Sequence, residues 1–178
     1  MVSLSLELDD IHNAAIGKVA TQWALLEKYI DVVIWDLVGS DPRDVACVTS
    51  QIGGVGRQID AMTALYELNG AGKKTLKALN KFAVTSGEMS RKRNRIIHDI
   101  WGYEEQTGEL YRFEITAQKR LVMDPHPVPL SDLAKVADDI RNHRGHLRKI
   151  TEEIYAEMFP SRKTPLGPFL LPTHPQSA

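Results

Sequence analysis

The chain has 178 residues, of which 43% are apolar and 25% charged, and this favours a single folded domain with a buried core. The net charge of -1 excludes a basic field over the whole protein, so any contact with nucleic acid needs a local basic patch. The single cysteine excludes an intrachain disulfide and a multi-thiolate zinc site. With no secretory pattern and no long apolar stretch, we expect a soluble cytoplasmic protein that does not contact membranes.

The first predicted element is a long amphipathic helix over residues 9–37, where apolar residues recur at spacings of three and four. Asp9 or Asp10 is expected to cap its start. Glu27 lies in the middle of the apolar face, and a carboxylate there needs a partner. We expect Arg93 to provide it, because an ion pair offsets the desolvation of both charges.

A second helix is predicted from Pro42 to about Asn69, since Pro42 suits a first helical turn and apolar residues again share one face. Glycines 53, 54 and 56 interrupt it. Each costs about 1 kcal/mol relative to alanine in a helix interior, so either another helix passes very close or the helix breaks there. Their spacing does not match a phosphate-binding loop.

A third helix is predicted over residues 73–100, with Leu79 and Ile97 on its inner face. Ser86 and Ser90 lie on that face, where large apolar residues are expected. These small residues leave room for another group. The last turns of the helix contain the basic stretch RKRNR, which raises the question of whether it is a solvated charge run or a phosphate-binding device.

After this helix the period changes to two, which predicts a small antiparallel hairpin or meander over about residues 101–124. A fourth amphipathic helix follows, from a cap at Ser131 or Asp132 to about Met158. The tail, residues 160–178, contains five prolines and is expected to act as an irregular docking arm.

Four long helices with mostly short connections indicate a mainly α fold, an antiparallel four-helix-type bundle with the hairpin inserted before the last long helix. The bundle and hairpin are expected to form one domain over residues 1–159. Such an architecture does not by itself indicate a function.

Residues 93–98, RNRIIH, match an R-[N/D/H]-x-x-x-H pattern and resemble the motif of the HEPN superfamily of helical-bundle domains. In that family the motif lies late in a long helix, as it does in the third predicted helix. The resemblance implies a metal-independent endoribonuclease without a cofactor, whose composite active site forms at a homodimer interface. Only Arg93, Asn94 and His98 correspond to the motif.

The resemblance implies a role for each of these three residues. His98 would act as general acid or base together with the same residue of a second copy. Arg93 would hold the phosphate and stabilise transition-state charge through its planar, permanently charged fork. Asn94 is four residues from His98 and would fix its orientation or bind phosphate directly.

Neighbouring residues are candidates for substrate binding. Arg91, Lys92 and Arg95 would attract RNA without reading its sequence. Trp101 would stack on an unpaired base, unless it is a core residue that closes the end of the bundle. The resemblance also raises a toxin-like or defence-related role with an antitoxin-like or other protein partner.

A second match to the pattern, RNHRGH over residues 141–146, lies in the fourth predicted helix. Asn142 and His146 project away from the apolar stripe of that helix, so we interpret this copy as a solvated face. Asp139, His143 and His146 have the helical spacing of metal ligands. Interleaved arginines make a metal site there a poor interpretation.

Two alternatives come from other functional classes. A non-catalytic module would bind RNA, nucleotides or a partner protein with the same basic patch. A structural or regulatory dimer would bury Arg93, Asn94 and Glu27 in a closed polar network. The nuclease differs from both, because it requires two His98 side chains near each other across a solvent-accessible cleft.

Overall fold

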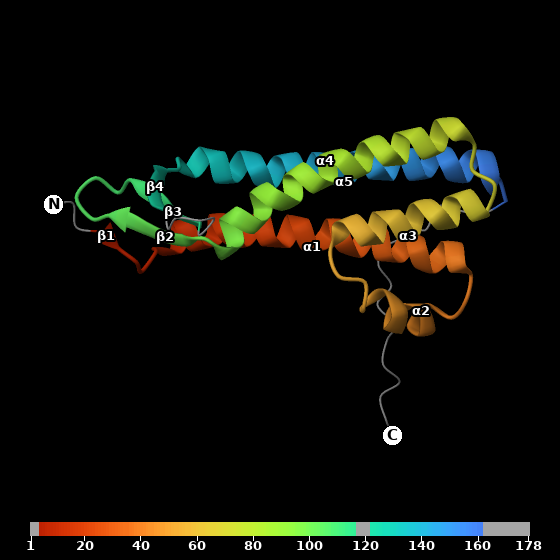
Figure 1. The fold of residues 1–178 in the computed structure, drawn as a ribbon, viewed down its shortest axis with the longest axis horizontal. Coiled ribbons are helices and arrows are strands. Elements are labelled where there is room, and N and C mark those ends of the chain that lie inside the picture. The colour runs from red at the N-terminus through yellow and green to blue at the C-terminus, as the bar shows by residue number, and fades with distance from the viewer. Residues whose placement is uncertain (1–3, 117–121, 162–178) are drawn as a thin grey trace, which may run out of the picture.

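The computed structural model describes residues 4–116 and 122–161. Its helices and strands, in chain order, are β1 (Leu4–Ser5), α1 (Asp10–Val38), α2 (Pro42–Thr49), α3 (Val55–Leu68), α4 (Lys73–His98), β2 (Ile100–Glu104), β3 (Leu110–Thr116), β4 (Val122–Pro127) and α5 (Leu130–Met158). The mainly α fold with a small sheet before the last long helix is therefore confirmed (Figure 1). Within the described residues, no helix combines the length and apolar character that crossing a bilayer requires.

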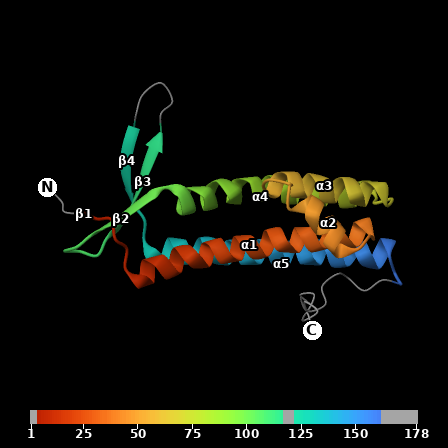
Figure 2. The same ribbon diagram turned by 90° about the horizontal axis from the view of Figure 1, so that it is seen from below.

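The four long helices form the bundle, with α3 and α4 on one side and α1 and α5 on the other (Figure 2). Helices α1 and α5 run in the same direction: Lys18 lies 3.9 Å from Asp138 near their starts, and Tyr155 donates a hydrogen bond to Asp36 near their ends. Helix α4 runs the opposite way, back toward the sheet (Figure 1). The core between them is almost entirely aliphatic and aromatic.

Helix α1 begins at the cap that its sequence predicts. The side chain of Asp9 accepts the backbone N–H of His12 at 2.9 Å and so caps the first turn. Gly39 ends the helix in the left-handed conformation, with φ of 70°.

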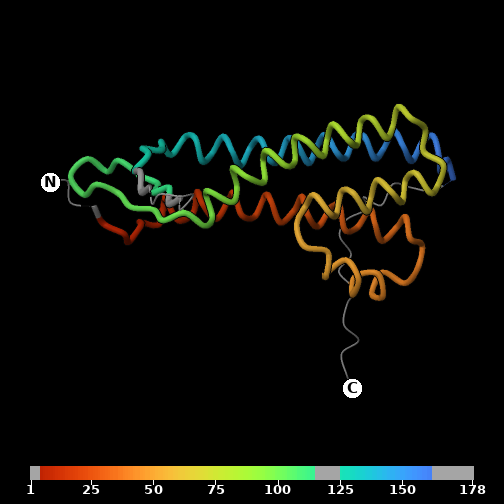
Figure 3. The backbone as a smooth tube through the Cα atoms, viewed as in Figure 1, coloured from red at the N-terminus to blue at the C-terminus, as the bar shows by residue number. Residues whose placement is uncertain are grey.

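The helix predicted from Pro42 to about Asn69 breaks at its glycines into α2 and α3 (Figure 3), which is one of the two alternatives that these glycines allowed. Gly54 starts α3 with φ of 82° and ψ of 144°, a conformation that other residues rarely adopt. A Cβ atom built on Gly53, Gly54 or Gly56 would meet no atom within 4 Å. The glycines therefore permit a break rather than a close helix contact. Because α2 carries the chain back along α1, α3 runs parallel to α1 (Figure 1).

The sheet lies at the end of the bundle where α4 finishes, with its strands in the order β1-β2-β3-β4 and all pairs antiparallel. Strands β2, β3 and β4 form the predicted meander, whereas β1 was not predicted. A Cβ atom on Gly102 would lie 3.0 Å from the backbone oxygen of Ser5, so the glycine permits the close approach of β1.

Helix α5 follows the sheet directly. Pro129 precedes its first residue, and no side chain caps the start, so the predicted cap at Ser131 or Asp132 is wrong. Proline at this position already fixes φ at -58° and needs no side-chain bond to direct the chain into the helix. Apart from Pro160 and Ser161, the predicted docking arm lies outside the described residues.

Candidate functional site

The last turn of α4 is held in place by backbone and side-chain bonds. The N–H of Asp99 donates to the carbonyl of Arg95 at 3.1 Å, and the indole Nε1 of Trp101 donates to the carbonyl of Ile96 at 2.8 Å. Both carbonyls lie in the last turn of α4, where backbone oxygens have no hydrogen-bond partner within the helix itself. The cationic Arg95 also lies where the helix dipole is negative. His98 is the last residue of this turn, so the same bonds help to fix its backbone.

The three motif residues divide between two sides of α4. Arg93 is partly buried, and its Nε atom is inaccessible and has no hydrogen-bond partner within the described residues. Asn94 and His98 are both exposed. The Nη1 atom of Arg93 donates to the side-chain oxygen of Asn94 at 3.0 Å. Asn94 thus orients the guanidinium rather than the imidazole, and the expected Asn94–His98 contact is absent from the described residues.

A network of charges ties the end of α4 to the sheet. The Nη2 atom of Arg95 lies 2.8 Å from the Oε1 atom of Glu114 on β3, and its Nη1 atom lies 3.5 Å from the Oδ1 atom of Asp99. Arg112, also on β3, lies 3.7 Å from each of the same two carboxylates. His126 on β4 lies 3.9 Å from Glu114. The two arginines and two carboxylates balance each other, so Arg95 contributes less free positive charge than its place in the basic stretch suggests.

Four members of this network were missed from sequence: Asp99, Arg112, Glu114 and His126. Arg95 and Asp99 are four apart, a spacing that indicates a helix-surface pair. Arg112 and Glu114 share one face of a strand that was predicted. The sequence does not show the strand register that places this face of β3 against the end of α4.

The predicted substrate-binding residues differ in accessibility. Arg91 and Lys92 are exposed and have no carboxylate within 4 Å in the described parts of the chain. Trp101 is only 8% exposed, and its one N–H is used by Ile96. Its prediction as a stacking platform is therefore wrong, and the alternative of a core residue that closes the bundle is confirmed.

The predicted ion pair between Glu27 and Arg93 is also wrong. Glu27 lines an open pocket of about 320 Å³ between α1 and the α2–α3 connection, with Asp31 and Gln58 beside it. Gln58 donates to Asp31 at 2.9 Å, and burial raises the pKa of Asp31 above its ordinary value. Glu27 lies roughly 25 Å along α1 from the sheet end, at 1.5 Å per residue, whereas Arg93 is near that end of α4.

The second motif copy is not simply a solvated face. Asn142 and His146 are exposed as expected, but His143 is only 6% exposed. Its ring stacks on Phe82 with centroids 4.0 Å apart and planes at 4°, and its Nε2 lies 2.8 Å from the hydroxyl oxygen of Ser86. His143 thus fills the room that the small Ser86 leaves on α4. Its spacing of three from Ile140 was the available signal for an inward side chain.

The described residues contain no group of three or more histidine, cysteine or acidic side chains arranged to hold a metal ion. Comparison of the chain with known protein families, curated proteins and solved structures finds no match. The likeness to HEPN domains consequently stays an interpretation of residues 93–98 and of the helix that carries them.

Proposed function

We propose that the protein is a metal-independent endoribonuclease of the HEPN type, in which two copies of the chain form one composite active site. The placement of residues 93–98 supports the proposal most directly. They form the last turns of a long bundle helix, at the end of the bundle where the sheet lies. There Arg93 is oriented by Asn94, and His98 is exposed.

The chemistry follows from these groups. One His98 removes the proton of a ribose 2′-hydroxyl, whose oxygen then attacks the adjacent phosphorus. The partner subunit's His98 donates a proton to the departing 5′-oxygen, and the products carry a 2′,3′-cyclic phosphate and a free 5′-hydroxyl. Arg93 donates hydrogen bonds to the phosphate oxygens as negative charge develops on them. A single copy provides one motif imidazole, so both proton transfers need the dimer.

One observation favours a second candidate, a non-catalytic RNA-binding dimer. The amide of Asn94 is engaged by Arg93, so within the described residues no side-chain hydrogen bond orients the ring of His98. A general base gains from such an orienting bond, whereas phosphate binding requires only the charge of Arg93. RNA cleavage, as opposed to RNA binding without cleavage, distinguishes the two functions.

The test incubates wild-type protein with single-stranded RNA and tRNA in EDTA, beside His98→Ala. His146→Ala is the matched control, because it removes another exposed histidine, from the second motif copy. We expect wild type and His146→Ala to leave cyclic-phosphate or 3′-phosphate ends, and His98→Ala to cleave on the order of 100-fold or more slowly. Dimerisation is checked by light scattering at micromolar concentration.

Three results would decide against the nuclease. Equal cleavage by wild type and His98→Ala would remove the role of His98. A strictly monomeric wild-type protein would exclude the composite site. RNA binding that Arg93→Ala abolishes, without any cleavage by wild type, would establish the binding module instead.

A further inference from the structure

Positive charge is concentrated in one helix. Helix α4 contains eight lysine and arginine residues and one carboxylate, a net charge of +7. The whole chain has a net charge of -1, so all other residues together have a net charge of -8. A balanced total thus hides a strongly basic element, the kind of local field that attracts polyanions.

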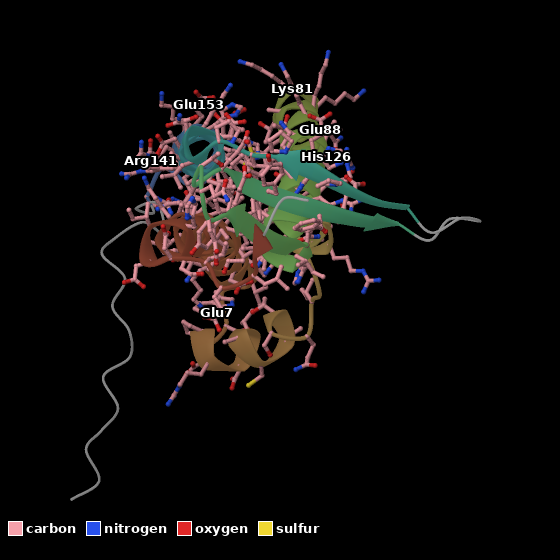
Figure 4. The ribbon with its side chains drawn as sticks, turned by 90° about the vertical axis from the view of Figure 1, so that its left-hand side faces the viewer. Glu7, Lys81, Glu88, His126, Arg141 and Glu153 are labelled. Atoms are coloured by element: carbon pink, nitrogen blue, oxygen red, sulfur yellow. The ribbon has the colours of Figure 1, made fainter. Side chains whose placement is uncertain are left out.

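Most of this charge lies on a single side of the helix. At 100° per residue, six basic side chains fall within an arc of about 100°, opposite the buried residues Leu79 and Ser86. We call this the α4 basic face: Lys73, Lys74, Lys77, Lys81, Arg91 and Lys92. All six are exposed. Figure 4 shows Lys81 and Glu88 on the outer side of α4, where long side chains with nitrogen tips extend into solvent.

These charges are not neutralised by neighbours. In the described portion of the chain, none of the six has a carboxylate within 4 Å, in contrast to Arg95 at the end of the same helix. Glu88 is the one acidic residue of α4, and it too has no ion-pair partner there. A helix face that is merely solvated usually intersperses both signs of charge, as α5 does.

We infer that the α4 basic face binds the sugar-phosphate backbone of RNA and guides it to His98. The inference rests on the proposed function and adds the path of the substrate. From Lys73 to Lys92 the face spans roughly 28 Å at 1.5 Å per residue. Phosphates of one strand of B-form DNA are ~3.4 Å apart along the axis, and by comparison this face is long enough to contact several phosphates of a strand. His98 lies at the margin of this face, beyond its C-terminal end.

The setting of α4 favours RNA over an anionic membrane. A helix that binds at a membrane surface inserts an apolar face between the lipids. The apolar face of α4 is occupied by the bundle core, and Val84 is the only large apolar side chain exposed among the basic residues. Continuity with the exposed His98 is a further reason, because a substrate strand has to reach that residue.

The experiment compares two double variants with equal changes in charge. Lys77→Gln/Lys81→Gln removes two charges from the α4 basic face, whereas Lys135→Gln/Lys149→Gln removes from α5 two exposed lysines that form no ion pair with any described residue. Binding to a fluorescein-labelled 12-nucleotide 2′-O-methyl RNA, which lacks the attacking hydroxyl, is measured by anisotropy over a salt series. Cleavage of the unmodified RNA is measured separately.

We expect the α4 pair to weaken binding on the order of tenfold and to reduce the slope of log K against log salt by about 1.4, or about 0.7 per lost contact. The α5 pair should remain within about twofold of wild type, because those lysines lie on another helix. Glu88→Gln should strengthen binding, because it removes the only carboxylate from the path.

Equal weakening by both pairs would overturn the inference, yet cleavage by wild type would leave the proposed nuclease intact. Selective weakening by the α4 pair without cleavage by wild type would support the binding path and exclude the nuclease. A wild-type protein that binds phosphatidylserine vesicles but not the RNA probe would make α4 a membrane-contact surface and overturn the inference.

Discussion

His143 makes the stability of the bundle sensitive to acid. The single hydroxyl proton of Ser86 is donated to the carbonyl of Phe82 at 2.9 Å. The Ser86 oxygen must therefore accept a hydrogen bond from the Nε2–H of a neutral His143. A further proton would have to enter at Nδ1.

Burial, and to a smaller extent the neighbouring His146, lowers the pKa of His143 from 6.5 to about 4. Since each pKa unit corresponds to about 1.4 kcal/mol, keeping this ring neutral is linked to about 3 kcal/mol of stability. The unfolded chain takes up the proton near pH 6.5 and the folded chain only near pH 4. The contribution is thus complete above pH 6.5 and is lost as the pH falls to about 4.

The assay is urea unfolding of wild type and His143→Phe at several pH values from 7 to 4. Phenylalanine keeps an aromatic ring against Phe82 but does not titrate. We expect the free energy of unfolding of wild type to fall by about 3 kcal/mol more than that of the variant over this range. Parallel pH dependences for the two proteins would refute the buried neutral imidazole.

Four further substitutions probe the backbone and the end of α4. Gly54→Ala should lower the free energy of unfolding by about 1–2 kcal/mol because of its positive φ, whereas Gly56→Ala, in the first turn of α3, should raise it by about 0.5 kcal/mol in the same urea titration. Arg112→Gln should lower the free energy of unfolding by about 1–2 kcal/mol, because it leaves Asp99 and Glu114 with Arg95 as their one arginine partner. Calorimetry in 1 M salt should show a smaller decrease, because salt screens these charges. Trp101→Phe should lower the free energy of unfolding by about 1 kcal/mol, because it leaves the carbonyl of Ile96 without its hydrogen bond. The Kd for RNA should not change, and a higher Kd would contradict the buried position of the indole.

The fold was largely predictable because its long helices have strong local signals. Apolar periodicity identified all four bundle helices, and Asp9 gave the start of the first. The break between α2 and α3 was one of two alternatives that the glycines allowed, and only the surroundings of Gly54 decide between them. Strand β1 has two residues and exists because Gly102 lets it approach β2, a contact that no local pattern indicates.

The candidate site was less predictable because tertiary contacts determine the environment of each side chain. The exposure of His98 follows from its place on the helix, but the pairing of Arg93 with Asn94 does not. Trp101 is equally compatible with stacking and burial until its indole is seen to cap α4. The pairing of Arg112 with Asp99 depends on strand register and on the angle between sheet and helix.

Helix α2 lies outside the bundle and packs mainly against α1 (Figure 1). Only Val45 and Thr49 of its eight residues are buried, and its connection to α3 runs through two glycines. Few contacts need to break for this segment to detach, so its amide hydrogens should exchange through local opening while those of the bundle await global unfolding. We therefore expect two levels of cooperativity in the chain, with the exposed thiol of Cys47 on the element that opens first.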